Sequence, residues 1–346
     1  MNKINYPKDS KELAKFEQAY RDCLDKTNVI EINKHLNKLK FKGKLLNFES
    51  LITFSFEDLI DLDKTITTYS KTFNVTKKVK SKKIIENNFE KLFDYKSNQP
   101  KIADFFMQND YFNFKICHYC GIEYINAFRD LDDYFDGLDF LNRADIYDLQ
   151  IVKGIGKERA KNIIDKRNIG KFNDIDDIGL TKDIRDEIKR FDFKNGHNHF
   201  TLDHVIPQKT HKFYSLCLYN FVPSCYSCNS KFKKAKEFIL NDDLKKISPT
   251  SNLYSLTDDF KFKLFYTREL KKIKTNSDFV IEKNILSNEA HIKQYLSIFK
   301  INGRYVFHKD LVLSLVEKKI MYPDTKIKEL SKKTGKSIET LKKEIF

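Results

Sequence analysis

Apolar residues recur at helical spacing along most of the chain. The first stretch lies behind Asp9 and Ser10, either of which fits the cap of a helix. The apolar positions of this predicted helix, which spans residues 10–26, are Leu13, Phe16, Tyr20, Cys23 and Leu24. Only six prolines and ten glycines interrupt the 346 residues. The region up to residue 110 is therefore predicted to continue as helices joined by short loops.

The charge pattern changes sign near the middle of the chain. Residues 130–148 are rich in aspartate, and residues 151–172 are rich in lysine and arginine. The change falls at a short segment that contains Gly154 and Gly156, which predicts a helix, a tight turn and a second helix. These glycines allow the backbone to approach a ligand closely. Amides at the start of the second helix, beside Lys157, suit one phosphate of a nucleic-acid backbone.

This segment resembles the helix-hairpin-helix motif of DNA-binding and DNA-repair proteins. The residues that carry the resemblance are Asn142, Arg143, Ala144, Asp148, Leu149, Val152, Lys153, Gly154, Ile155, Gly156, Ala160, Ile163, Ile164, Arg167, Gly170, Lys171 and Phe172. The resemblance implies contacts with double-stranded DNA through Lys153, Gly154, Ile155, Gly156 and Lys157. Residues 175–191 look like a second copy without the Gly-x-Gly turn, so a packing role is expected for them. The alternative is that both hairpins act only as a rigid spacer.

Four of the six cysteines fall into two Cys-x-x-Cys pairs, Cys117 with Cys120 and Cys225 with Cys228. A two-residue spacer lets both thiolates of a pair bind one metal ion at about 2.3 Å. Each pair chelates locally, so the long insert between the pairs does not weaken the pattern. The sequence therefore predicts a tetrahedral structural zinc site, with free buried thiols as the alternative.

Acid, imidazole and amide side chains gather around the second cysteine pair. Asp203 and His204 are neighbours, Asn220 follows them, and Asn229 comes directly after Cys228. Neighbours on an extended strand face opposite ways, so convergence of Asp203 and His204 requires a bend after them. The pattern indicates a two-stranded hairpin followed by a helix that begins at Asn229. Carboxylate and amide oxygens suit Mg²⁺, and a neutral imidazole can activate water.

Together these elements resemble the HNH endonuclease family in its zinc-bearing, His-Asn-Asn form. The residues that carry the resemblance are Cys117, Cys120, Asp203, His204, Val205, Ile206, Pro207, Asn220, Cys225, Cys228, Asn229 and Lys233. The resemblance implies that His204 is the general base and that Asp203 and Asn229 hold a Mg²⁺ or Mn²⁺ ion. Asn220 would brace the loop that carries His204. Lys231 or Lys233 would contact the scissile region, with simple surface lysines as the alternative.

The expected fold class is α+β overall, mainly α-helical with a small ββα-metal core of the HNH, treble-clef-like kind. We expect a helical region at 1–104, a discontinuous nuclease domain at 105–240 with a helix-hairpin-helix insert at about 140–193, and a helical region at 241–346. Residues 325–346 resemble a helix-turn-helix, with a plain helical hairpin as the alternative. The lysine run at 77–83 suits either phosphate contact or a solvated surface.

Composition adds a preference for partner and compartment. The formal charge of +15 favours a polyanionic partner, and the alternative is that the richness in Lys, Asn and Ile reflects an AT-biased genome. We find neither an N-terminal apolar leader nor a run of about 18 apolar residues that spans a bilayer, so a cytoplasmic protein without membrane contact is expected. The expected function is metal-dependent hydrolysis of double-stranded DNA, with a protein partner or as a homodimer. A non-cleaving zinc-stabilised DNA-binding module, an RNA-cleaving nuclease, and a role in restriction, antiphage defence or a mobile element stay open.

Overall fold

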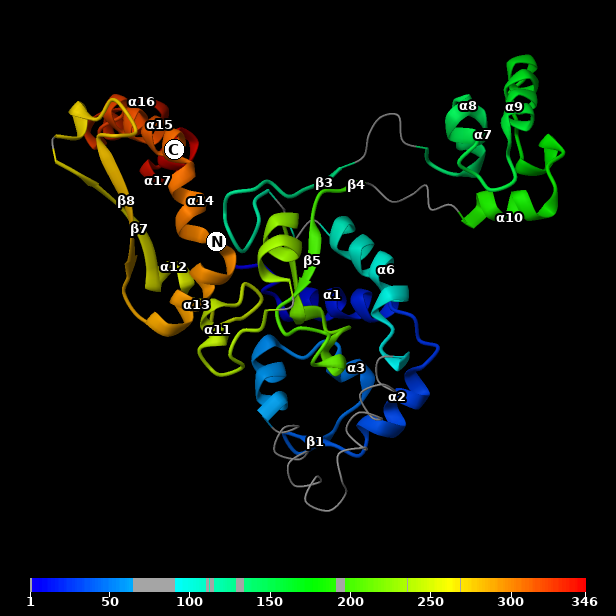
Figure 1. Ribbon diagram of the computed structural model, residues 1–346, viewed down its shortest axis with the longest axis horizontal. Coiled ribbons are helices and arrows are strands. Elements are labelled where there is room, and N and C mark those ends of the chain that lie inside the picture. The colour runs from blue at the N-terminus through cyan, green and yellow to red at the C-terminus, as the bar shows by residue number, and fades with distance from the viewer. Residues whose placement is uncertain are drawn as a thin grey trace. The chain divides into compact units, whose positions relative to one another are not determined.

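The computed structural model describes residues 2–64, 91–109, 112, 115–128, 134–190, 197–234, 236–267 and 269–346. They form two compact units (Figure 1). The core unit comprises Met1–Ile102, Tyr111–Ile125 and Phe200–Phe346, and the insert unit comprises Ala103–Asp110 and Asn126–His199. The lysine run at 77–83 and the first aspartates of the acidic stretch, at 130–133, lie outside the described residues. Among the described helices, none combines the length and the hydrophobicity that a membrane span requires.

Helices dominate the N-terminal part of the chain, as predicted. The first helix, α1, spans Ser10–Cys23 and is capped by Asp9, whose Oδ1 accepts hydrogen bonds from the amides of Lys11 and Glu12 at 2.9 and 3.0 Å. The elements that follow are α2 (Val29–Leu36), β1 (Lys40–Phe41), β2 (Lys44–Leu45), α3 (Phe48–Leu51) and α6 (Tyr95–Gln108). The buried hydroxyl of Tyr20 on α1 donates to the carbonyl of Leu216 at 2.7 Å, which joins α1 to a segment distant in sequence.

A two-stranded antiparallel hairpin in the core unit carries the predicted acid and histidine. Strand β5 (Thr201–His204) pairs with β6 (Phe221–Ser224), so that Asp203 stands opposite Val222 and His204 opposite Phe221. The short turns η3 (Lys212–Tyr214) and η4 (Leu218–Asn220) lie between the strands. A π-helical segment, η5 (Ser227–Lys233), follows β6. The order of strand, strand and helix agrees with the predicted order, and the helix begins two residues before Asn229.

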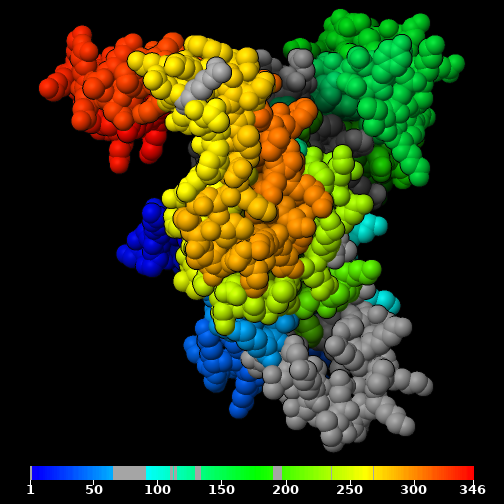
Figure 2. All heavy atoms as spheres, turned by 60° about the vertical axis from the view of Figure 1, so that its left-hand side comes forward, coloured from blue at the N-terminus to red at the C-terminus, as the bar shows by residue number. Residues whose placement is uncertain are grey.

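The C-terminal part of the core unit combines a β-ribbon with helices. Its elements are α11 (Leu244–Ile247), α12 (Leu256–Asp259), β7 (Phe260–Tyr266), η6 (Leu270–Lys272), β8 (Phe279–Ile285), α13 (Glu289–Phe299), α14 (Ile301–Phe307), α15 (Lys309–Met321), α16 (Asp324–Thr334) and α17 (Ile338–Ile345). Phe279 and Ile281 on the ribbon form a small core with Val316 on α15. Figure 2 shows the orange atoms of α13 and α14 packed against the yellow and yellow-green atoms of preceding residues. The sequence predicts helices throughout this region, and the ribbon of β7 and β8 differs from that prediction.

The last two helices match the predicted turn. Gly335 ends α16 in the left-handed region, with φ of 70°, and Ser337 caps α17 by accepting a hydrogen bond from the amide of Thr340. Both a helix-turn-helix and a plain helical hairpin contain this turn, so the two alternatives stay open.

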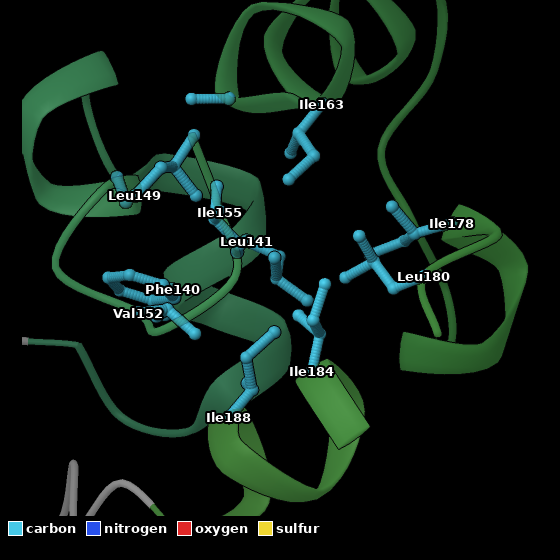
Figure 3. Packing of buried hydrophobic residues seen from close by; sticks show 12 residues of the cluster. Phe140, Leu141, Leu149, Val152, Ile155, Ile163, Ile178, Leu180, Ile184 and Ile188 are labelled. Atoms are coloured by element: carbon cyan, nitrogen blue, oxygen red, sulfur yellow. The ribbon is translucent and has the colours of Figure 1, made fainter. Parts of the chain in front are cut away.

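The insert unit is built from short helices around its own hydrophobic cluster. Its elements are β3 (Ala127–Phe128), α7 (Gly137–Arg143), α8 (Ile146–Leu149), α9 (Lys157–Ile169), η2 (Ile175–Ile178), α10 (Lys182–Arg190) and β4 (His197–Asn198). Strands β3 and β4 pair antiparallel and close the two ends of the unit. Figure 3 shows apolar side chains from the helices and both turns converging on one core, with Leu141 and Ile188 fully buried in it.

Candidate nucleic-acid interface and metal centre

The tight turn between α8 and α9 contains the two predicted glycines, which have different roles. Gly154 has φ of 95°, and a Cβ built on it would lie 3.0 Å from Cγ1 of Ile184. This position therefore requires glycine for the turn and for packing on α10. Gly156 is the extended residue that precedes α9, and a Cβ on it would meet nothing within 4 Å. Gly156 consequently leaves open space in front of the helix.

The start of α9 has the properties of an anion-binding site. No side chain caps it, and Lys153, Gly156 and Lys157 are exposed around it. Uncapped amides and the positive end of the helix dipole favour a phosphate at this place. Ile155 differs from the expectation of a DNA contact, because its side chain is buried in the cluster and its amide donates to Val152 within the turn. Its role is to anchor the turn.

The second hairpin also joins two helical segments, but through a different turn. Gly179, with φ of 74°, separates η2 from α10, and Ile178 and Leu180 on either side are buried. The ammonium of Lys166 on α9 donates to the carbonyl of Ile178 at 3.0 Å. These contacts agree with the packing role expected for this copy.

The four paired cysteines come together as predicted. Their sulfur atoms all lie within 4.8 Å of one another, and all four side chains are buried. The Sγ atoms of Cys120 and Cys225 are 4.0 Å apart, close to the about 3.8 Å that a tetrahedral site with zinc–sulfur bonds of about 2.3 Å requires. Gly121, at φ of 62°, closes the first turn by donating its amide to the carbonyl of Cys117. This donor set fits zinc, and Cys117, Cys120, Cys225 and Cys228 would hold the ion.

The carboxylate of Asp203 is buried and has partners on both oxygens. It is 4% exposed, its Oδ1 lies 3.0 Å from the ammonium of Lys233, and its Oδ2 accepts a hydrogen bond from the phenol of Tyr119 at 2.6 Å. Burial raises the pKa of Asp203, and the charge of Lys233 opposes this rise. The same ammonium donates to the carbonyl of His204 at 2.6 Å. Asp203 therefore joins β5, η5 and the first cysteine pair.

Lys233 differs from the expectation of a contact near the scissile phosphate. Its side chain is only 1% exposed, so in this conformation it reaches Asp203 and not solvent. Lys231 on the same segment is exposed, with its ammonium 5.9 Å from the ring of Phe232. Of the two predicted lysines, Lys231 is the one that faces solvent.

The imidazole of His204 is enclosed by aromatic rings and fixed by the backbone. It is 7% exposed, and its ring centroid lies 4.6 Å from that of Tyr95 on α6 and 4.7 Å from that of Phe221. Burial lowers the pKa of His204 to about 4, so the ring is neutral at pH 7. Nε2 lies 3.0 Å from the carbonyl of Ser215. Because a carbonyl only accepts, Nε2 carries the proton and Nδ1 keeps its lone pair.

The two asparagines occupy different environments. Asn220 is fully buried, and its Oδ1 accepts from the amide of Ile206 at 2.8 Å while its Nδ2 donates to the carbonyls of Ile206 and Tyr214. It thus fastens both ends of the loop after His204. Asn229 is half-buried, and its Nδ2 donates to the Thr201 hydroxyl at 3.1 Å. Asn229 on η5 therefore contacts β5, the strand that carries Asp203.

Two residues that the sequence analysis did not assign to the site contact it. The phenol of Tyr119, which lies within the first Cys-x-x-Cys pair, reaches Asp203. Its place between two cysteines was the available signal. Tyr95 on α6 covers His204, and the sequence around Tyr95 and His204 does not indicate this contact. It arises from packing between segments far apart in the chain.

Comparison with known proteins supports the prediction made for one of these regions, the insert unit. A family model described as a helix-hairpin-helix motif matches residues 137–188. The insert unit carries a helix-hairpin-helix motif. The match runs from α7 to α10, so both hairpins belong to it, and it supports binding of DNA by the insert unit. No curated protein and no solved structure matches the chain.

Proposed function

We propose that the chain is a metal-dependent endonuclease of the HNH kind that hydrolyses double-stranded DNA bound by its helix-hairpin-helix insert. The observation that carries the proposal is the arrangement of β5, β6 and η5. It brings an acid and a histidine to the end of one strand, an asparagine brace to the start of the next, and a second asparagine onto the following helix. Four cysteines suited to zinc hold this arrangement to the first cysteine turn.

The state of His204 supports a role as general base. The imidazole is neutral at pH 7, and the hydrogen bond from Nε2 to Ser215 directs the free lone pair to Nδ1. In the proposed reaction, Nδ1 takes a proton from the attacking water. Asn220 keeps the loop after His204 in place, so the ring orientation is set before DNA binds.

The oxygens of Asp203 and Asn229 would hold the catalytic cation. A carboxylate offers about four lone-pair sites, and the two oxygens of Asp203 each use one for Lys233 and Tyr119. The remaining sites and the amide oxygen of Asn229 are ligands that Mg²⁺ or Mn²⁺ prefers. When bound, such an ion stabilises negative charge on the phosphate and on the leaving oxygen.

The burial of Asp203 and His204 favours a second candidate function. A general base needs a water molecule within hydrogen-bond reach, and Tyr95 covers His204. If this contact never opens, the chain is a zinc-stabilised DNA-binding module that does not cleave. Under the endonuclease proposal, the contact between Tyr95 and His204 opens when DNA or the cation binds.

The proposal is tested with matched DNA and RNA duplexes of one sequence. The wild-type chain is incubated with each duplex and Mg²⁺ or Mn²⁺, and binding and cleavage are measured on the same samples. We expect cation-dependent cleavage of the DNA duplex. Binding of DNA without cleavage under every condition supports the non-cleaving module, and preferential cleavage of the RNA duplex makes RNA the substrate.

A further inference from the structure

The C-terminal helices of the core unit lie directly on the cysteine turns. The phenol of Tyr305 on α14 donates to the carbonyl of Cys120 at 2.8 Å. The phenol of Tyr295 on α13 donates to the carbonyl of Tyr119. The ring of Phe299 stacks on that of Tyr119 with centroids 4.4 Å apart. Residues from beyond the predicted nuclease domain therefore complete the surroundings of the first cysteine pair.

One residue of α14 contacts both cysteine turns at once. Nη1 of Arg304 donates to the sulfur of Cys228 at 3.2 Å, and Nη2 pairs with Oε1 of Glu123 at 2.6 Å, just after the first turn. The guanidinium also lies 5.2 Å from the ring centroid of Phe232. The other carboxylate oxygen of Glu123 accepts from the hydroxyl of Ser227, beside Cys228. Arg304 and Glu123 thus link the two turns through a second layer of contacts.

The charge at the cysteine cluster explains why a guanidinium belongs there. Four thiolates and one Zn²⁺ carry a formal charge of −2, and a buried net charge is costly without a compensating partner. The side chain of Arg304 is only 14% exposed, so its own charge also needs partners. Its planar fork offers donors in two directions, which a lysine ammonium does not reproduce.

We propose that Arg304 is a positioning residue for the zinc site, and that zinc occupancy holds α13 and α14 against the two cysteine turns. The donated hydrogen bond partly neutralises the thiolate of Cys228 and so slows loss of the ion. In return, the zinc-bound thiolates provide the negative partner that keeps Arg304 docked. This inference rests on the zinc binding included in the proposed function, and it is independent of DNA cleavage.

The first test measures zinc retention by the full chain against a competing chelator. Arg304→Gln removes the charge and is expected to release zinc roughly 10- to 100-fold more readily, the effect of losing one hydrogen bond to a charged group. Arg304→Lys keeps the charge but cannot contact Cys228 and Glu123 together. Its loss of zinc retention is therefore expected to be smaller than that of Arg304→Gln. The control is Arg143→Gln, whose arginine pairs with Asp139 in the insert unit and whose zinc retention should equal that of wild type.

The second test uses the wild-type chain, so it does not depend on folding of a variant. Amide hydrogen exchange is measured with zinc bound and after chelation, and protection of residues 289–307 is expected to fall when zinc leaves. Unchanged protection of α13 and α14, or equal zinc retention by folded Arg304→Gln and wild type, overturns the inference. Wild-type protein that never binds zinc overturns the zinc part of the proposed function as well.

Discussion

The hairpin of the insert unit and the Asp203 centre of the core unit are built in opposite ways. At the hairpin, α9 begins without a side-chain cap and Gly156 faces open space. At the Asp203 centre, both carboxylate oxygens have protein partners and His204 lies beneath Tyr95. A phosphate-binding turn functions with its amides already exposed, whereas a general base must first gain a water molecule. Under the proposed function, the hairpin can therefore bind DNA as it stands, whereas the Asp203 centre must open before it can cleave.

Removal of zinc should produce the largest difference in stability between the two regions. The cysteine cluster belongs to the core unit, and the hydrophobic cluster of the insert unit contains no cysteine. Because a structural zinc site supplies folding free energy directly, we expect a chelator to destabilise the core unit by several kcal/mol and to spare residues 137–188. Hydrogen exchange resolved by segment measures both regions in one sample. Equal loss of protection in the two regions would contradict their independence.

Loss of the Lys233 ammonium should show how much the core unit depends on its buried charge pair. Lys233→Met leaves the carboxylate of Asp203 buried without its cation, which costs about 3–5 kcal/mol of unfolding free energy. Urea denaturation measures the change. The control is Lys231→Met on the same segment, where an exposed lysine is expected to change stability by less than about 0.5 kcal/mol. Similar values for the two variants would show that the ion pair does not stabilise the fold.

Acidic pH should lower the stability of the core unit, because the folded state buries His204 in its neutral form. Burial lowers the pKa of the folded residue to about 4 from an ordinary 6.5. Between these values the unfolded chain binds a proton that the folded chain excludes, so stability falls as the pH drops from about 6.5 to 4. The full shift corresponds to about 3 kcal/mol. Thermal unfolding across this window should show a shallower fall for His204→Gln than for wild type, and parallel curves would mean that the imidazole is not buried as described.

A methyl group at Gly156 should produce the smallest effect and should alter DNA binding alone. Gly156→Ala fits the extended backbone and open space, so the melting temperature should not change. If a phosphate approaches this backbone, the added Cβ lowers DNA affinity several-fold. Gly170→Ala is the matched control, because Gly170 flanks the opposite end of α9 and also has open space at its Cβ. Equal DNA affinities for the two variants would show that this turn does not bind phosphate.

Features set by neighbouring residues could be predicted from the sequence. The glycine turn, the helix behind Asp9 and the two cysteine pairs each depend on a few adjacent positions, and the structure contains all three. The β7 strand of the ribbon could also have been predicted, because Phe260, Phe262 and Leu264 alternate with lysines. The prediction of helices for this region overlooked this period of two.

Contacts between distant segments could not be predicted in the same way. Whether Lys233 faces solvent or Asp203 depends on how η5 rotates against β5, and the spacing to Asn229 does not determine that rotation. The cover of Tyr95 over His204 depends on where α6 packs. The burial of the Asp203 centre therefore depends on packing between distant segments, and its catalytic role stays a prediction.

The most direct measurement of the central claim is nicking of supercoiled plasmid by wild type and His204→Ala with Mg²⁺ or Mn²⁺, with DNA binding measured on the same samples. The account predicts equal binding and a loss of nicking on the order of 10²- to 10⁴-fold for the variant, because the general base is gone while the helix-hairpin-helix insert is unchanged. Equal nicking by the two proteins, or no nicking by a wild-type chain that binds the plasmid, would contradict it.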